Sequence, residues 1–339
     1  MEYTLHKDFS EIPVAAWNEL AEAGISNTPF ARHEMLSEWW KTRGGGEWPQ
    51  AELMLVSASE NGELVGIAPL FKAEYEGRPA LLLVGSIEVS DYLDLIVRPA
   101  DLERFLAGLL DFLAHAGPCA GVPLDWYNIL DSSPTLPLLK QEAQRRGCAY
   151  RDEIYRPTPR ISLEGGFDAY LARIDKKQRH EIRRKMRRAA ESALPVQFYV
   201  VENGSTLEAE IEAFLELMSH DTSKADFLHA AMRTHVAGVI RTAHAHGYLW
   251  LAFLTIGDKK AAAALNFDYA NKLWGYNSGV SREYMELSPG WVLLTHQIQW
   301  ACEHGRYEFD FMRGDEEYKY RFGGVNRYVM RAVVSPHSP

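Results

Sequence analysis

Polar residues able to do chemistry gather near the C-terminus, after an expected strand over residues 307–311. The chain reads there Asp310-Phe311-Met312-Arg313-Gly314-Asp315-Glu316-Glu317-Tyr318-Lys319. Polar side chains concentrated after a strand, with an exposed glycine among them, are typical of the edge of a site. The Lys319 ammonium could bind a phosphate or a developing oxyanion, and the hydroxyl of Tyr318 or Tyr320 could protonate a leaving group. The alternative is a solvated turn with local Asp, Arg and Lys pairs.

A second candidate site lies upstream, where Ser288-Pro289-Gly290 follows an expected strand and opens an expected helix over residues 289–304. Ser288 is a favourable N-cap, and Pro289 fits the first helical position. Because Gly290 leaves backbone N–H groups uncovered, this helix N-terminus can hold an anion. The same residues also suit an ordinary cap, but their place after a central strand of a mixed sheet favours a functional interpretation.

A basic run stands out in an acidic chain. The formal net charge is −10, yet residues 173–188 contain nine basic side chains against Asp175 and Glu181. A local basic stripe on an acidic protein suggests a confined anionic partner. Two interpretations stay open: a solvated linker helix, or a surface that contacts donor phosphates, a tRNA acceptor stem or an anionic lipid-linked saccharide.

Several common catalytic motifs are missing from the sequence. It has no GxxxxGK[ST] loop and no GxGxxG after a strand, which removes the main support for kinases and dinucleotide enzymes. It has no HExxH, and His229, His235, His244 and His246 are not spaced to share one helix face, so we expect no metal. No GxSxG elbow occurs, and no cysteine has an obvious local partner. The remaining chemistry depends on positioning and polarisation rather than on a covalent nucleophile.

The composition is that of a globular protein. Of the 339 residues, 47% are hydrophobic and 24% are charged, and this length favours roughly two domains. The longest charge-free apolar stretches, such as residues 247–257, are shorter than the ~18 residues of a membrane helix. Residues 1–9 lack the apolar run of a signal peptide, and three widely spaced cysteines indicate a reducing compartment. We therefore expect a soluble cytoplasmic protein.

Apolar periodicity predicts an α/β protein with mixed sheets that arose by internal duplication. The order β, α, α, β, β, β, α, β occurs twice, about 190 residues apart. Residues 63–85 and 259–279 correspond especially well, each as turn, apolar strand, turn, apolar strand. We expect an N-terminal domain over residues 1–155, a connecting strand and basic helix over 156–195, and a C-terminal domain over 196–339.

Taken together, blocks spread over nearly the whole chain resemble the CelD-like branch of the GNAT acyltransferases, relatives of the FemAB peptidyltransferases. The matching blocks are Trp17, Pro29-Phe30 with Trp39-Trp40, Tyr92-Leu93-Asp94, Tyr170-Leu171 with Lys177, Arg179 and Ile182-Arg183-Arg184, Ser288-Pro289-Gly290, and Asp310 to Phe322. The resemblance implies two tandem GNAT-like domains that face a shared cleft. It also implies transfer of an acyl group from acyl-CoA to an amine or hydroxyl, by direct attack in a ternary complex.

One departure from the family pattern affects the donor. GNAT proteins hold the CoA pyrophosphate on a Q/R-x-x-G-x-G/A turn, whereas this sequence has only Ser288-Pro289-Gly290 at that place. The FemAB relatives use aminoacyl-tRNA instead. The donor is therefore expected to be acetyl-CoA or another acyl-CoA, with aminoacyl-tRNA as the alternative.

The resemblance also assigns roles to residues. Asp310 is the expected base or acceptor-orienting group, Tyr318 the proton donor and Lys319 the anion clamp. The donor would be held by Tyr276, Asn277, Ser278, Ser288, Pro289 and Gly290. The acceptor would be contacted by Tyr92, Asp94, Arg313, Gly314 and Asp315, and candidate anion contacts are Lys177, Arg179, Arg183 and Arg184.

These observations lead to one expected function and two alternatives. We expect a cytoplasmic N- or O-acyltransferase that acts on a small-molecule, cell-envelope or polysaccharide precursor. The alternatives are aminoacyl transfer from tRNA, and a non-catalytic binding or regulatory protein with the same fold.

Overall fold

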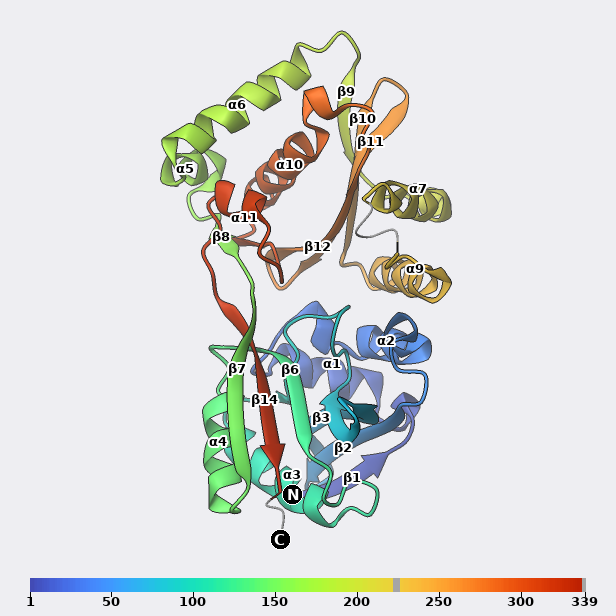
Figure 1. Ribbon diagram of the computed structural model, residues 1–339, viewed down its shortest axis with the longest axis vertical. Helices are drawn as coiled ribbons and strands as arrows, with labels where there is room; N and C mark the ends of the chain where they lie inside the picture. The colour runs from blue at the N-terminus through green and yellow to red at the C-terminus, as the bar shows by residue number, and fades with distance from the viewer. Residues whose placement is uncertain (222–225, 337–339) are drawn as a thin grey trace. The chain divides into compact units, whose positions relative to one another are not determined.

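The computed structural model describes residues 1–221 and 226–336, which form two compact units. Unit 1 contains Met1–Pro157 and the last strand of the chain, and unit 2 contains Thr158–Asn326. Each unit is a mixed sheet with helices packed on it (Figure 1). The predicted α/β class with mixed sheets is therefore confirmed.

Unit 1 is built on a sheet with the strand order β1-β2-β3-β4-β6-β14-β7, and β5 pairs with β3. The strands are β1 (Glu2–His6), β2 (Glu52–Glu60), β3 (Glu63–Tyr75), β4 (Arg78–Leu83), β5 (Ile96–Val97), β6 (Leu124–Leu130), β7 (Ala149–Pro157) and β14 (Tyr328–Ser335). Its helices are α1 (Val14–Glu22), α2 (His33–Gly46), α3 (Leu102–His115) and α4 (Thr135–Arg145). The predicted hairpin of β2 and β3 turns at Asn61 and Gly62, whose φ values of 54° and 84° suit a tight hairpin turn.

Unit 2 has the strand order β8-β13-β12-β11-β10-β9. The strands are β8 (Arg160–Ser162), β9 (Val196–Val200), β10 (Leu249–Ile256), β11 (Lys259–Tyr269), β12 (Lys272–Val280) and β13 (Glu308–Asp310). The helices are α5 (Gly166–Arg173), α6 (Lys176–Ala190), α7 (Leu207–Ser219), α9 (Ala230–Ala245), α10 (Pro289–Glu303) and α11 (Glu317–Arg321). Helices α7 and α9 cover one face of this sheet, and α5, α6 and α10 cover the other (Figure 1).

The predicted repeat of element types is present in both units. Apart from the two-residue strand β5, unit 1 runs β1, α1, α2, β2, β3, β4, α3, β6, and unit 2 runs β9, α7, α9, β10, β11, β12, α10, β13. On one face of the unit 2 sheet, α5, α6 and α10 share one apolar core; Ile182 and Ala189 of α6 and Val292 and Ile298 of α10 belong to it. A close approach on the other face explains Gly279 of β12, where a Cβ would lie 2.4 Å from the backbone of α7.

The predicted domain boundaries differ from the observed units. Strand β14, expected to lie in a C-terminal domain over residues 196–339, pairs with β6 and β7 of unit 1 instead. The basic helix α6, expected in a connecting segment, packs against α10 inside unit 2. Both differences arise from long-range pairing, because neither the partners of a strand nor the neighbours of a helix are set by local periodicity.

The buried carboxylate of Asp94 organises the start of α4 in unit 1. One of its oxygens accepts hydrogen bonds from Thr135 Oγ1 at 2.6 Å and Leu95 N at 2.8 Å, and the other accepts from Ser133 Oγ at 2.5 Å. Burial raises the pKa of Asp94 to about 6, although these hydrogen bonds oppose the shift. Its side chain thus has partners within unit 1, which gives Asp94 a structural role there.

We expect Asp94 to make the stability of unit 1 depend on pH. Its pKa is about 6 in the folded state and 3.8 without burial, so the folded state binds more protons between these values. The stabilising contribution of Asp94 is therefore complete below pH 3.8 and is lost as pH rises through 6, a change of about 3 kcal/mol at most. Urea unfolding of the wild type and of Asp94→Asn at pH 4.5, 5.5 and 7 measures it. The advantage of the wild type should shrink as pH rises; a constant difference would contradict the assignment.

Candidate active site

Two parallel strands of unit 2 pair only briefly and then separate. Strand β12 pairs with β13 at three positions, the last of which joins Trp274 to Asp310. Beyond it, β12 continues along β11 to Val280, whereas the chain after β13 turns towards β8, where Phe311 N donates to Pro159 O at 3.0 Å. The carboxyl ends of parallel strands that diverge next to a crossover helix are a common position for a ligand.

The predicted donor residues Tyr276, Asn277 and Ser278 lie on β12 just past this separation. A β-bulge falls at the same place, because Gly275 pairs with Asn266 while Asn277 pairs with Leu265, which leaves Tyr276 as the extra residue. Bulges occur often beside active sites, since they redirect the side chains of one strand. The Tyr276 ring packs 5.1 Å from that of Phe267, measured between centroids.

A buried polar pair joins the bulge to α10. The Asn266 side chain donates through Nδ2 to Gln297 Oε1 at 2.8 Å, and both residues are buried. Sequence analysis missed this pair. The sequence signal for it is Gln297, which stands on the apolar side of α10. Because buried polar groups are normally hydrogen-bonded, a glutamine at such a position indicates a buried polar partner.

The N-terminus of α10 differs in part from the prediction. Ser288 occupies the N-cap position and Pro289 opens the helix, as expected. However, Ser288 has a left-handed backbone (φ 54°, ψ 54°), and its side chain caps no amide. The Ser288 carbonyl accepts the amides of Trp291 at 3.0 Å and Val292 at 3.1 Å. The amide of Gly290 donates to no acceptor within residues 1–221 and 226–336.

Lys319 supports the loop that follows β13. Its side chain is 2% exposed, and Nζ donates to the carbonyls of Met312 at 3.2 Å, Arg313 at 2.9 Å and Gly314 at 3.4 Å. Glu316 also pairs with it, at 2.9 Å. The predicted role of Lys319 as an anion clamp is not supported by these contacts, because the ammonium already serves three carbonyls and a carboxylate.

The other two predicted catalytic residues occupy different environments. Asp310 is fully buried at the end of β13, and its Oδ1 accepts from Met312 N at 2.8 Å. Tyr318 is 39% exposed and packs its ring against Phe311, with 6.3 Å between centroids. Partial burial, with a smaller effect of the Glu316 carboxylate, raises the pKa of Tyr318 above its ordinary value. The Tyr318 phenol therefore keeps its proton at neutral pH.

The remaining predicted acceptor residues divide between the units. Tyr92 and Asp94 belong to unit 1. Tyr92 is buried and has a left-handed backbone, with φ of 56°. The centroid of its ring lies 5.1 Å from the Cζ of the Arg327 guanidinium. Arg313, Gly314 and Asp315 belong to the loop after β13 in unit 2. The Asp315 carboxylate lies 2.5 Å from Tyr320 Oη, so this loop is tied to α11 by a second contact besides Lys319.

The four predicted anion contacts all lie on α6, but they differ in their partners. Arg179 donates to the carbonyls of Leu171 and Ala172, which caps the end of α5. Arg184 pairs with Glu181 at 2.7 Å. Lys177 and Arg183 are exposed and have no ion-pair partner in the described chain.

Two classes of feature are not found in the described residues. Among residues 1–221 and 226–336, no group of three His, Cys, Asp or Glu side chains is placed to hold a metal ion. Within the same ranges, every helix is too short or too polar to cross a membrane.

Comparison with known proteins agrees with this geometry. Residues 176–320 match the model of the acetyltransferase (GNAT) domain family. No curated protein matches the chain.

Solved structures share the fold of nearly the whole chain at low sequence identity. FemX has a TM-score of 0.68 and 12% identity over 98% of this chain and 97% of its own. L-PGS from Bacillus licheniformis has a TM-score of 0.59 and 14% identity over 96% and 93%. A tandem GNAT protein from the clavulanic acid biosynthesis pathway has a TM-score of 0.55 and 14% identity over 100% and 99%.

The matched residues include β12, α10 and β13, the elements that form the candidate site. Residues 176–320 thus match the GNAT acetyltransferase domain family, and the chain as a whole shares its fold with FemX and with a tandem GNAT protein.

Proposed function

We propose that the protein transfers an acyl group, most simply acetyl, from acyl-CoA to an amine or hydroxyl of a small-molecule, cell-envelope or polysaccharide precursor. The observation that carries the proposal is the separation of β12 from β13 beside the N-terminus of α10, within the segment that matches the GNAT domain. Three cysteines without disulfide bonds support action in the reducing cytoplasm.

The donor would bind across β12 and the start of α10. The bulged segment around Tyr276 would lie along the donor's acyl arm, and the Gly290 amide would face a donor phosphate at the positive end of the helix. A short loop joins these two parts of the site, so both ends of one extended donor would be held.

The reaction would be a direct attack by the acceptor. The acceptor nitrogen or oxygen forms a bond to the carbonyl carbon, the acceptor loses a proton, and the C–S bond breaks as the thiolate leaves. The protonated phenol of Tyr318 would supply the proton to that thiolate. Asp310 would hold the loop after β13 in place through the Met312 amide. Alignment of two bound reactants can supply about 7–11 kcal/mol.

A second candidate function is aminoacyl transfer from aminoacyl-tRNA. It is favoured by the shared fold with FemX over nearly the whole chain, and by the exposed basic side chains of α6. In this case the same opening between β12 and β13 would hold the aminoacyl ester, and the leaving group would be an RNA hydroxyl.

Acetyl-CoA should raise the thermal unfolding midpoint of the wild-type protein. A ligand at 100 times its Kd adds about 2.7 kcal/mol of stability. Gly290→Glu should abolish the shift, because it puts a carboxylate at the expected phosphate position. Gln299→Glu, which adds the same charge further along α10, should keep it. No shift in the wild type would contradict acyl-CoA as donor and leave aminoacyl-tRNA to be tested in the same assay.

Replacement of Tyr318 by Phe should slow transfer without loss of stability. Loss of a general acid typically costs at least ~100-fold in kcat, whereas the ring contact with Phe311 is retained. Tyr320→Phe is the matched control, because its hydroxyl contacts Asp315 on the loop and Asn326 after α11. Transfer kinetics with acetyl-CoA and a panel of amine and hydroxyl acceptors measure both variants. Equal rates for wild type and Tyr318→Phe would exclude Tyr318 as the proton donor.

A further inference from the structure

The outward side of α6 forms a continuous basic surface, called here the basic face. Its members are the exposed residues Lys176, Lys177, His180, Arg183, Arg184, Arg187 and Arg188. On the opposite side, Ile182 and Ala189 are buried in the core of unit 2. With 3.6 residues per turn and ~1.5 Å of rise per residue, these seven side chains share one side of the helix over ~18 Å.

Few carboxylates neutralise the basic face. Glu181 pairs with Arg184 at 2.7 Å and with Lys185 at 3.7 Å. Five cationic groups have no carboxylate within 4 Å in the described chain; they are those of Lys176, Lys177, Arg183, Arg187 and Arg188. The whole chain has 46 acidic and 36 basic residues, so a polyanion is repelled by most of the protein and attracted here.

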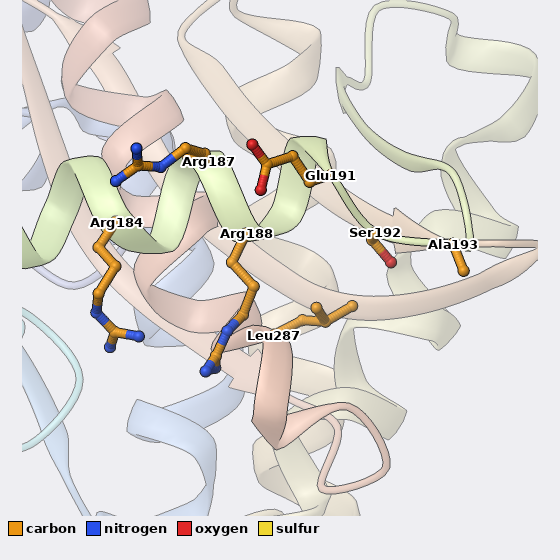
Figure 2. A pocket seen from close by; sticks show the side chains of 7 residues that line it. All are labelled: Arg184, Arg187, Arg188, Glu191, Ser192, Ala193 and Leu287. Carbon is orange, nitrogen blue, oxygen red and sulfur yellow. The ribbon is translucent and has the colours of Figure 1, made fainter.

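Three arginines of the basic face line a pocket of about 480 Å³ at the C-terminal end of α6 (Figure 2). Arg184 and Arg188 extend to the same side of the helix. Arg184 is held by both oxygens of Glu181, at 2.8 and 2.7 Å, and the Arg188 guanidinium donates to the carbonyl of Glu286. Guanidinium groups bind phosphate oxygens through paired N–H donors. The three arginines therefore suit a phosphate group, and they outnumber the one carboxylate that lines the pocket, that of Glu191.

The basic face lies next to the proposed donor site. Lys185 of α6 places its ammonium 4.0 Å from the centroid of the Trp291 ring, in the first turn of α10. Leu287, which lines the arginine pocket, is two residues before Pro289. A donor with its acyl group at β12 and a long phosphate-bearing leaving group would therefore extend towards α6.

From this geometry we infer that the basic face of α6 docks the phosphate backbone of a structured RNA. The inference rests on the second candidate function, in which the acyl donor is an ester of RNA. A nucleic-acid duplex carries one charge per ~1.7 Å of axis with both strands counted, so an ~18 Å surface lies along a length of duplex with about ten phosphates, of which those on the near side face it. The contacts are to phosphates and select no base sequence.

A membrane surface fits this face less well. Helices that lie on a bilayer insert an apolar side between the lipids, but the apolar side of α6 is buried within unit 2. The exposed apolar residues near its end, Met285 and Leu194, are single side chains of a kind common on soluble surfaces.

Fluorescence anisotropy with a labelled RNA hairpin of about 12 base pairs tests the inference on the full-length protein. We expect wild-type binding to weaken steeply between 50 and 200 mM KCl. Arg183→Gln/Arg187→Gln should weaken binding at least 10-fold and reduce the slope of log K against log[KCl] by about 2. Arg233→Gln/Arg241→Gln, which removes equal charge from α9, should change binding less than 2-fold. Thermal unfolding of each variant checks that it is folded.

Three results would overturn the inference: no RNA binding at 50 mM KCl, equal weakening by the two double variants, or binding to phosphatidylglycerol vesicles in place of RNA. The acetyl-CoA shift is measured in the same variants and separates the two proposals. If RNA binding fails while acetyl-CoA still stabilises the protein, the docking surface is wrong and acyl-CoA transfer stands. If RNA binds and acetyl-CoA does not, the docking surface stands and the donor is not acyl-CoA.

Discussion

The short pairing between β12 and β13 is the constraint on which the candidate site depends. After Trp274 and Asp310, β12 stays with β11, and the chain that leaves β13 needs other partners for its polar groups. The Phe311 amide donates to the Pro159 carbonyl, and the Met312 amide donates to the Asp310 carboxylate. The Lys319 ammonium donates to the Arg313 carbonyl. The loop after β13 is thus held by hydrogen bonds where it leaves β12, and α10 begins beside the opening between the two strands.

Much of the fold could be predicted from the sequence, because its signals are local. The apolar periodicity of α10, the Asn61-Gly62 turn and the repeated order of elements all depend on neighbouring residues. Strand β14 could not be placed in this way. Its position between β6 and β7 depends on partners more than 150 residues away in the chain, and no local pattern identifies them.

The contacts of particular charged groups could not be predicted from the sequence. The sequence placed Lys319 among polar residues that follow a strand, and Asp94 among the residues expected to contact the acceptor. It could not show that three backbone carbonyls surround the Lys319 ammonium, or that two hydroxyls and an amide satisfy the Asp94 carboxylate. Tyr318 differs because 39% of its surface stays exposed. On α6, by contrast, the density of basic residues between 173 and 188 already indicated a charged surface.

The return of β14 to unit 1 also has a consequence for synthesis of the chain. Unit 2 is one continuous insertion, and its ends meet where the backbones of Arg160 and Val325 exchange hydrogen bonds of 3.0 and 2.9 Å. During translation, all residues of unit 2 are therefore synthesised before the last strand of the unit 1 sheet. The position of β14 between β6 and β7 stays vacant until residues 328–335 emerge. Synthesis of unit 1 therefore begins before that of unit 2 and ends after it.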